Sequence, residues 1–277
     1  MVGRAVASID YRFPYADVGH FGFFEVCPER ACAAKLMHAC EDWLRQRGKK
    51  RIEGPVNLNM LAGYRVQTAG FDTEPFPGEP RNPPHYAELL GELGYRDVAR
   101  WQSWDISPLA LLGLRAIDWL QRSTRRATKA RGYHIEKLRT DRLGEEIGKI
   151  HALVHEIFTD NYGFSAIDLA EHLQMQGGAV DGSVDVAGAF LYHRSQSEPV
   201  GFSYGFCIDD VAILHTFGVT QAHRGSGAAN LLFSYGLQDL RKRGVRSAVG
   251  ALAKEGKSKY ERIGRPARAY KIVGKEL

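Results

Sequence analysis

The stretch Gln221-Ala-His-Arg-Gly-Ser-Gly-Ala-Ala-Asn230 (QAHRGSGAAN) organises the last part of this 277-residue sequence. An apolar run, Val211–Val219, precedes it, and an amphipathic run over 226–243 follows it. These patterns predict a strand and then a helix, so the stretch is a strand-to-helix turn. Its small residues leave backbone amides uncovered where a helix N-terminus attracts anions. The sequence therefore predicts a phosphate site here, and a tight turn that binds nothing is the alternative.

Two common phosphate motifs do not match this turn. A Walker loop ends in Gly-Lys-Ser/Thr, which is absent. A dinucleotide fingerprint requires a third Gly or Ala and an acidic residue near the end of the next strand. The strand predicted over 245–252 carries no acidic residue. We therefore expect neither a nucleoside triphosphate in a Walker loop nor a dinucleotide.

The rest of the chain alternates between strand and helix patterns in two stretches joined by a connector. The second stretch predicts strands over 133–138, 186–193, 200–208, 211–219, 245–252 and 269–274, and helices over 143–158, 166–175, 226–243 and 257–263. The first predicts strands over 2–11, 19–26, 51–56 and 96–106, helices over 29–47 and 83–93, and a long loop over 57–84. The helical connector, 107–132, carries a basic cluster that is either a solvated face or a surface that attracts phosphates: Arg122, Arg125, Arg126, Lys129 and Arg131.

The two stretches share the same order of elements. Leu44-Arg-Gln-Arg-Gly48 ends the first long helix, and Leu240-Arg-Lys-Arg-Gly244 ends the later one. Each is followed by a short strand, a loop and a helix that starts near Tyr86 or Tyr260 and ends in glycine. This order favours an internal repeat over chance matches.

Composition and charge are those of an ordinary globular protein. Hydrophobic residues make up 44% and charged residues 25%, and Lys and Arg exceed Asp and Glu by 37 − 32 = 5. This modest excess suits an anionic ligand, and we do not expect a nucleic acid partner. The four cysteines include no Cys-x2-Cys pair, so we expect no zinc site and no metal. No signal peptide pattern and no apolar run of membrane-spanning length occurs, so we expect a cytoplasmic protein without a membrane partner.

The turn matches one family in its setting. Arg224-x-x-Gly227-x-Ala229 resembles the Gln/Arg-x-x-Gly-x-Gly/Ala motif of the GNAT superfamily of acetyltransferases, and Tyr260-Glu-Arg-Ile-Gly264 resembles its Tyr-x-x-x-Gly segment. The resemblance implies an α/β (α+β) fold with two GNAT-like mixed sheets flanked by helices, the N-terminal one incomplete. It assigns 1–106 to a degenerate domain with an acceptor-pocket or structural role, 107–132 to a connector, and 133–277 to the catalytic domain.

The resemblance implies acetyl-CoA, or another acyl-CoA, as cosubstrate. The backbone near Phe217 and Val219 would pair with the pantetheine arm, and the Val219 N–H would polarise the thioester carbonyl. The pyrophosphate would be held by the turn residues Arg224, Gly225, Ser226, Gly227, Ala228, Ala229 and Asn230. The corresponding N-terminal turn, Val26-Cys-Pro-Glu-Arg-Ala, has no glycine loop, and Glu29 would repel a phosphate. We therefore expect one working CoA site.

The resemblance also implies two catalytic residues. Some relatives carry a glutamate general base near the position of Ile213, and His215 is the replacement on the same strand face. A hydrogen-bonded structural histidine is the alternative. Tyr260 matches the general acid that protonates the CoA thiolate, or it is a core aromatic. The family's asparagine seven residues earlier is Ala253 here, so Lys254 or Lys257 would have to supply the CoA contact.

The acceptor implied is the primary amine of a small polar molecule, bound in a cleft between the halves. The predicted acceptor residues come from loops rich in Asn and Tyr: Asp160, Asn161, Tyr162, Asn57, Asn82 and Tyr86. Ordinary turn chemistry is the alternative for these residues. Two other functions stay open: an aminoacyl-tRNA-dependent transferase built from two GNAT-like halves, and a non-catalytic CoA-binding protein.

Overall fold

The computed structural model of the chain describes residues 2–59, 63, 65–176, 184–256 and 259–277. The N-terminal half contains β1 (Gly3–Ser8), β2 (Val18–Val26), α1 (Arg30–Arg45), β3 (Arg51–Gly54), β4 (Val66–Ala69), α2 (His85–Glu92) and β5 (Arg96–Ile106). The connector forms α3 (Pro108–Leu120) and α4 (Arg122–Ala130). The C-terminal half contains β6 (Tyr133–Lys137), α5 (Leu143–Phe158), α6 (Leu169–Met175), β7 (Asp185–His193), β8 (Gly201–Ile208), β9 (Val211–Val219), α8 (Ala228–Lys242), β10 (Ser247–Lys254) and β11 (Arg265–Glu276).

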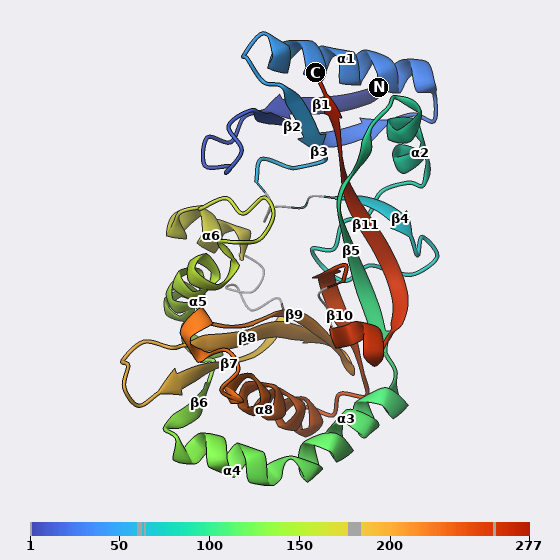
Figure 1. Cartoon of the computed structure of the whole chain (residues 1–277). Coiled ribbons are helices and arrows are strands. Elements are labelled where there is room, and N and C mark those ends of the chain that lie inside the picture. Colours follow the sequence, from blue (N-terminus) through green and yellow to red (C-terminus); the bar gives the residue numbers. More distant parts are fainter. Residues whose placement is uncertain (1, 60–62, 64, 177–183, 257–258) are drawn as a thin grey trace.

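The strands form one continuous sheet with the order β1-β2-β3-β11-β5-β10-β9-β8-β7-β6, and β4 pairs with β11. The last strand of each half lies beside the other half. β11 pairs with β3 of the N-terminal half, and β5 pairs with β10 of the C-terminal half. Figure 1 shows β5 and β11 running side by side between the two halves, with both chain ends at the N-terminal end of the molecule. This strand exchange joins the two expected GNAT-like sheets into one.

The ends of the two long helices confirm that the halves follow the same local plan. After α1, the N–H of Lys49 donates to the carbonyl of Leu44 (3.1 Å) across Gly48, whose φ is 75°. After α8, the N–H of Val245 donates to the carbonyl of Leu240 (3.0 Å) across Gly244, also at 75°. Both helices therefore end with a left-handed glycine, because only glycine adopts that conformation without a steric cost.

Helices cover both faces of the C-terminal part of the sheet. The inner side of α5 packs with Phe190, Tyr192 and Phe202 on one face. The start of α8 packs with Tyr133, Leu191 and Val219 on the other face. In Figure 1, α4 lies beyond α8, so the connector forms the outer edge of this half. The core thus has three layers, with β9 at its centre.

Most predicted elements are present, with differences in their bounds: the connector forms two helices, β1 ends at Ser8 and β11 starts at Arg265. β5, α5 and β9 have the predicted bounds. β4 lies inside the stretch predicted to be loop, and the helix predicted over 166–175 starts only at Leu169, where the side chain of Asp168 caps it. The helix predicted over 257–263 is a short 3-10 turn, Lys259–Arg262. Lys257, a predicted CoA contact, lies outside the described residues.

Candidate active site

The QAHRGSGAAN turn forms an open loop at the start of α8. Gly225 and Gly227 have φ values of 75° and 81°, a left-handed conformation that favours glycine. Within the described residues, the N–H groups of Gly225, Gly227 and Ala229 donate no hydrogen bond, whereas that of Ala228 donates to Ser226 Oγ (3.2 Å) and that of Asn230 to the carbonyl of Gly227 (3.1 Å). Several donors at a helix N-terminus are thus available to an anion, as the sequence predicted.

Two arginines border this turn. The side chain of Arg224 donates to the carbonyls of Val219 (3.3 Å) and Ile157 (3.5 Å), which leaves further guanidinium donors available. Arg131, from the basic cluster at the end of α4, donates to the carbonyl of Ser226 and to Thr128 Oγ1 (3.2 Å). Arg131 therefore adds a positive charge beside the turn. Arg125 of the same cluster is held by Asp118 instead (2.8 Å).

The strand that leads into the turn separates from its neighbour. β9 and β10 pair in parallel from Val211 with Ser247 to Leu214 with Gly250, and within the described residues their ladder ends there. On its other side, β9 stays paired with β8, and the Thr220 N–H donates to the carbonyl of Val200 (2.9 Å). Because N–H groups alternate in direction along a strand, those of Phe217 and Val219 point toward the gap between β9 and β10.

Tyr260 lies at the point where the two strands separate. A Cβ atom built on Gly250 would lie 2.5–2.8 Å from the Tyr260 ring, so only glycine at this position leaves room for the ring. Burial raises the pKa of Tyr260 to about 12, which keeps the hydroxyl protonated at neutral pH. Because Gly250 pairs with Leu214, the Tyr260 ring lies beside the residue that precedes His215 on β9.

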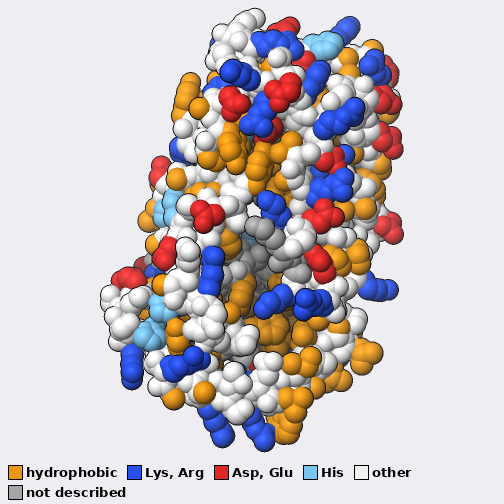
Figure 2. Space-filling model, in the orientation of Figure 1, with side chains coloured by type: hydrophobic (Ala, Val, Ile, Leu, Met, Phe, Trp, Pro, Cys, Tyr) orange, Lys and Arg blue, Asp and Glu red, His pale blue; other side chains and the backbone are white. Residues whose placement is uncertain are grey.

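His215 lies on the opposite face of the sheet from Tyr260. Its ring centre lies 6.4 Å from that of Tyr204, which packs with α5, whereas Leu214 packs on the α8 side with Tyr260. The ring is solvent-exposed, and its Nδ1 lies 2.8 Å from Thr216 Oγ1. Desolvation, and then the positive charge of Arg65, lower the pKa of His215 to about 4. Figure 2 shows Lys and Arg side chains on the surface between the two halves.

Arg65 is a residue near this site that the sequence did not single out. It comes from the N-terminal half, is 8% exposed, and its guanidinium lies 4.4 Å from the centre of the Trp101 ring. Arginine stays protonated in proteins, so Arg65 places a buried positive charge on the His215 side of the sheet. No motif in the long loop pointed to it, because a single arginine beside Tyr64 carries no spacing signal.

Tyr162 brings the predicted acceptor loop of the C-terminal half to the N-terminal half. Its hydroxyl donates to Glu53 on β3, and Lys254 Nζ at the end of β10 lies 5.7 Å from its ring centre. Burial raises the pKa of Glu53. Asp160 and Asn161 of the same loop are exposed. The loop therefore lies near the end of β10, where the gap between β9 and β10 opens.

The other predicted acceptor residues have structural contacts elsewhere. Asn57 accepts a hydrogen bond from the Phe23 N–H (2.7 Å) and donates to the carbonyl of Gly63. Tyr86 is buried in the N-terminal core, and its hydroxyl accepts from the Val26 N–H (3.3 Å). The structure thus does not bring these two side chains to Tyr260 and His215.

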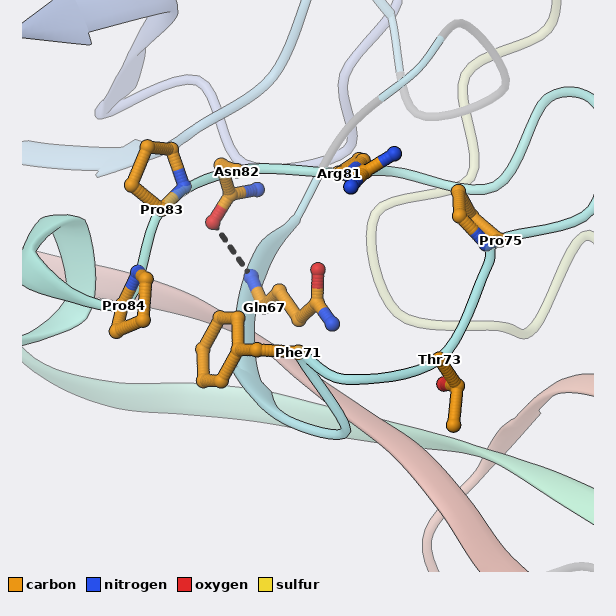
Figure 3. A pocket seen from close by; sticks show the side chains of 8 residues that line it. All are labelled: Gln67, Phe71, Thr73, Pro75, Arg81, Asn82, Pro83 and Pro84. Atoms are coloured by element: carbon orange, nitrogen blue, oxygen red, sulfur yellow. Dashed lines mark hydrogen bonds between the residues drawn. The ribbon is translucent and has the colours of Figure 1, made fainter.

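Asn82 lines a separate cavity in the N-terminal half. Its Oδ1 accepts from the Gln67 N–H (2.9 Å). Figure 3 shows this contact at the wall of a cavity of about 320 Å³, and the side chains around it. The lining residues are Gln67, Phe71, Thr73, Pro75, Arg81, Asn82, Pro83 and Pro84. None of them belongs to the QAHRGSGAAN turn.

The corresponding turn of the N-terminal half, before α1, contains two thiols and a carboxylate. The ligand atoms of Cys27, Glu29 and Cys32 lie within 4.8 Å of one another at the start of α1. Structural zinc sites use four protein ligands, and no fourth joins this set within the described residues. The hydrogen bond with Cys27, and then desolvation, raise the pKa of the Cys32 thiol to about 11, so it is protonated at neutral pH.

Comparison with curated proteins gives partial matches. No model of a known protein family matches the chain. It is 29% identical over 175 residues to Protein YghO of Escherichia coli (strain K12), which is 62% of this chain and 43% of that protein. It is 27% identical over 181 residues to the bacterial ceramide synthase of Caulobacter vibrioides (strain NA1000 / CB15N), 63% of this chain and 45% of that protein. The matches thus span less than half the length of these relatives.

Solved structures match over nearly the whole chain. A tandem GNAT protein from the clavulanic acid biosynthesis pathway has a TM-score of 0.53 and 13% identity, covering 94% of this chain and 75% of that one. A GCN5-related N-acetyltransferase from Sphaerobacter thermophilus has a TM-score of 0.51 and 15% identity, covering 98% and 76%. A GCN5-related glucosamine N-acetyltransferase region of a fungal GH3 β-N-acetylglucosaminidase has a TM-score of 0.55 and 12% identity, covering 99% and 31%. These likenesses concern the fold, and they confirm the predicted α/β class.

Proposed function

We propose that this chain, whose fold is that of a tandem GNAT protein, is an acyltransferase that transfers an acyl group from acyl-CoA to a primary amine. The observation that carries the proposal is the gap between β9 and β10. The glycine turn with free amides lies at one end of it, and the Tyr260 ring lies on Gly250 at the other. A phosphate site, a row of strand donors and a proton donor therefore follow one another along a single path.

The cosubstrate fits this path in one direction. The pyrophosphate would bind the amides of Gly225 and Gly227 with Arg224 and Arg131 beside it. The pantetheine arm would run along Phe217 and Val219, in the manner of an added strand. The thioester would then reach the point where the ladder ends, between Tyr260 on one face and His215 on the other.

In the reaction, the amine nitrogen attacks the thioester carbonyl carbon, the C–N bond forms and the C–S bond breaks. The Phe217 N–H, the nearer of the two gap-facing donors to the end of the ladder, would stabilise the oxyanion. Tyr260 would donate its proton to the departing thiolate, and the proton of the amine would pass to His215 or to water. Because Arg65 disfavours a second positive charge beside His215, the amine would be bound in its neutral form.

The acceptor and the acyl chain are proposed as classes. The region around Tyr162, whose hydroxyl donates to Glu53 and whose ring lies beside Tyr15, offers both polar and aromatic groups, which suit an amine with a polar group. One curated relative is named a ceramide synthase, so long-chain amino alcohols and long acyl chains belong in the test with small polar amines and acetyl-CoA. With each of these acceptors and acyl donors, we propose that the acyl group is transferred to the amine nitrogen.

The test is calorimetry with CoA, acetyl-CoA and long-chain acyl-CoA, followed by thiol release with a panel of amines. We expect binding of CoA species and amine-dependent thiol release. Binding without thiol release for any amine would support a non-catalytic CoA-binding protein. The absence of binding to every CoA species, together with a salt-sensitive gel shift with tRNA, would overturn the proposal in favour of an aminoacyl-tRNA-dependent transferase.

A further inference from the structure

The connector helix α3 exposes large apolar side chains to solvent. Their exposed fractions are Leu109 78%, Leu120 69%, Leu112 60%, Trp119 59% and Ile117 52%. The opposite side of the helix is already used, because Leu111 is buried and Leu114 packs beside it in the core with α8. α3 is therefore apolar on both its inner and its outer side, whereas a surface helix of a globular protein normally presents polar residues outward.

The charged residues of α3 are held against the protein. Arg115 donates to the carbonyl of Val245 (3.1 Å), and Asp118 pairs with Arg125 of α4 (2.8 Å). With 100° per residue, the exposed side chains fall in one arc of about 160° that holds no polar residue. The residues in this arc, called here the α3 face, are Leu109, Leu112, Gly113, Ala116, Ile117, Trp119 and Leu120. A continuous apolar face of this kind marks an interaction site.

Unpaired positive charge lies directly beside the α3 face. The guanidinium of Arg122 lies 4.3 Å from the centre of the Trp119 ring. Arg126 and Lys129 follow at helical spacing and are exposed, and within the described residues none of these three forms an ion pair. Figure 2 shows hydrophobic and basic side chains together along the edge that α3 and α4 form in Figure 1.

The charge decides which partner fits. Two copies that met through their α3 faces would bring two unpaired basic segments together, and like charges repel. An anionic lipid surface instead accepts apolar side chains and attracts the flanking cations, and tryptophan is favoured at the level of the headgroups. We propose that the α3 face and the basic start of α4 dock the protein on the surface of an anionic lipid bilayer.

This proposal concerns surface docking and does not depend on the acyltransferase proposal. Among the described residues, no helix is long and apolar enough to cross a membrane. The lack of such a span fits the expectation of no membrane partner, and the proposal adds docking at the surface without a span. Acyl transfer and vesicle binding are measured separately, so either proposal can fail while the other holds.

The experiment is flotation of the full chain with vesicles of phosphatidylcholine alone or mixed in equal parts with phosphatidylglycerol. We expect flotation with the mixed vesicles and much less with the neutral ones. Leu109→Glu with Leu120→Glu should weaken binding at least about tenfold. Arg122→Ser with Arg126→Ser should weaken it by about fivefold for each side chain. All of these side chains are exposed, so thermal unfolding should confirm that the variants stay folded.

A matched control distinguishes binding through the α3 face from nonspecific binding through any exposed apolar side chain. Tyr11 is 90% exposed and lies in the N-terminal half, so Tyr11→Glu should bind mixed vesicles as the natural chain does. A shift of tryptophan emission to shorter wavelength on adding vesicles should be absent in Trp119→Phe. The proposal is overturned if neither vesicle binds, or if the Leu109→Glu, Leu120→Glu variant floats normally. It is also overturned if light scattering shows a dimer that this variant dissociates without any vesicle binding.

Discussion

The two strand-to-helix turns of this chain have the same position in their halves, but they present opposite chemistry to a ligand. After β9, Gly225 and Gly227 in left-handed conformations open a loop with free amides and two arginines beside it. After β2, the chain enters α1 through Glu29, whose side chain makes no capping hydrogen bond. A carboxylate and two thiols stand where the other turn offers donors. A helix N-terminus therefore binds an anion only where the residues before it leave the amides uncovered.

The strand gaps beside the two turns differ in the same way. β2 and β3 pair from Val18 to His20 and then separate, as β9 and β10 do. The chain after β3 fills the N-terminal gap, because the Val56 N–H donates to the carbonyl of Phe21 (2.7 Å). A Cβ on Gly22 would lie 2.0 Å from the Val56 carbonyl oxygen, so no room remains there. The pairing of β10 with β5 instead has a register shift between Gly250 and Ala253, and within the described residues the pairing of β10 with β9 ends at Gly250.

The largest effect is expected from closing the C-terminal turn. Gly227→Val adds a branched side chain at a φ of 81°, with its Cβ 3.2 Å from Thr128 Oγ1, and covers the amides of the turn. Loss of two charge-assisted hydrogen bonds of about 1.5–3 kcal/mol each lowers CoA affinity by about 10²–10⁴-fold. Calorimetry with CoA measures this loss.

The matched control is Gly244→Val at the other end of α8. Gly244 has a φ of 75°, and no atom lies within 4 Å of its Cβ position, so this variant carries similar backbone strain away from the turn. Its CoA affinity should stay within about twofold, because distant sites act independently. Equal CoA binding by Gly227→Val and the natural chain would remove the turn from the cofactor site.

The second comparison is between Tyr260 and its N-terminal counterpart Tyr86. Tyr260→Phe should lower kcat about 10²-fold with an unchanged KM for acyl-CoA, because it removes the proposed proton donor. With a pKa raised to about 12, Tyr260 stays protonated below that pH, so its loss should lower kcat evenly across pH 6–9. Tyr86→Phe should leave kcat unchanged, since its hydroxyl lies in the N-terminal core. Similar losses in both variants would make Tyr260 a structural residue.

The pH dependence tests His215. Desolvation lowers its pKa from 6.5 to about 4, so the ring is neutral above about pH 5 and its own titration does not limit the rate there. The rate should then rise with pH as the acceptor amine loses its proton. His215→Asn should lower kcat/KM about tenfold, below the usual range of about 10²–10⁴-fold for general-base effects because the base is weak, without moving this rise. An acid limb near pH 6.5 that disappears in His215→Asn would contradict the lowered pKa.

Periodicity and turn chemistry were sufficient to predict most of the helices and strands and the order of the proposed site residues along the chain. The apolar run Val211–Val219 predicted β9, and the small residues after it predicted the start of α8, because both signals are local. The strand exchange was not predictable, since β5 and β11 follow similar helices and their patterns fit a partner in either half. β4 was missed because four residues between glycines and prolines are too short for a periodic signal.

The site residues that escaped the sequence come from the N-terminal half. Arg65 and Glu53 reach the site only because β5 and β11 bring the two halves together, and no local pattern encodes such a contact. Tyr86 was predicted as an acceptor residue because it lies in a region rich in Asn and Tyr, and it also repeats the position of Tyr260. In a half whose gap is filled, that position serves the core, so the repeat predicted the place of the side chain but not its role.

The smallest effect tests the filled gap itself. Asn57→Ala removes the acceptor of the Phe23 N–H (2.7 Å) next to β2. A backbone donor left without a partner costs about 1–2 kcal/mol, a fall in Tm of roughly 2–6 °C by thermal unfolding. Because the chain itself fills this gap, we expect no change in CoA affinity or in the KM for the acceptor. If Asn57→Ala instead raised the acceptor KM at unchanged Tm, Asn57 would belong to the acceptor site, and the N-terminal gap would be part of the active site rather than its closed counterpart.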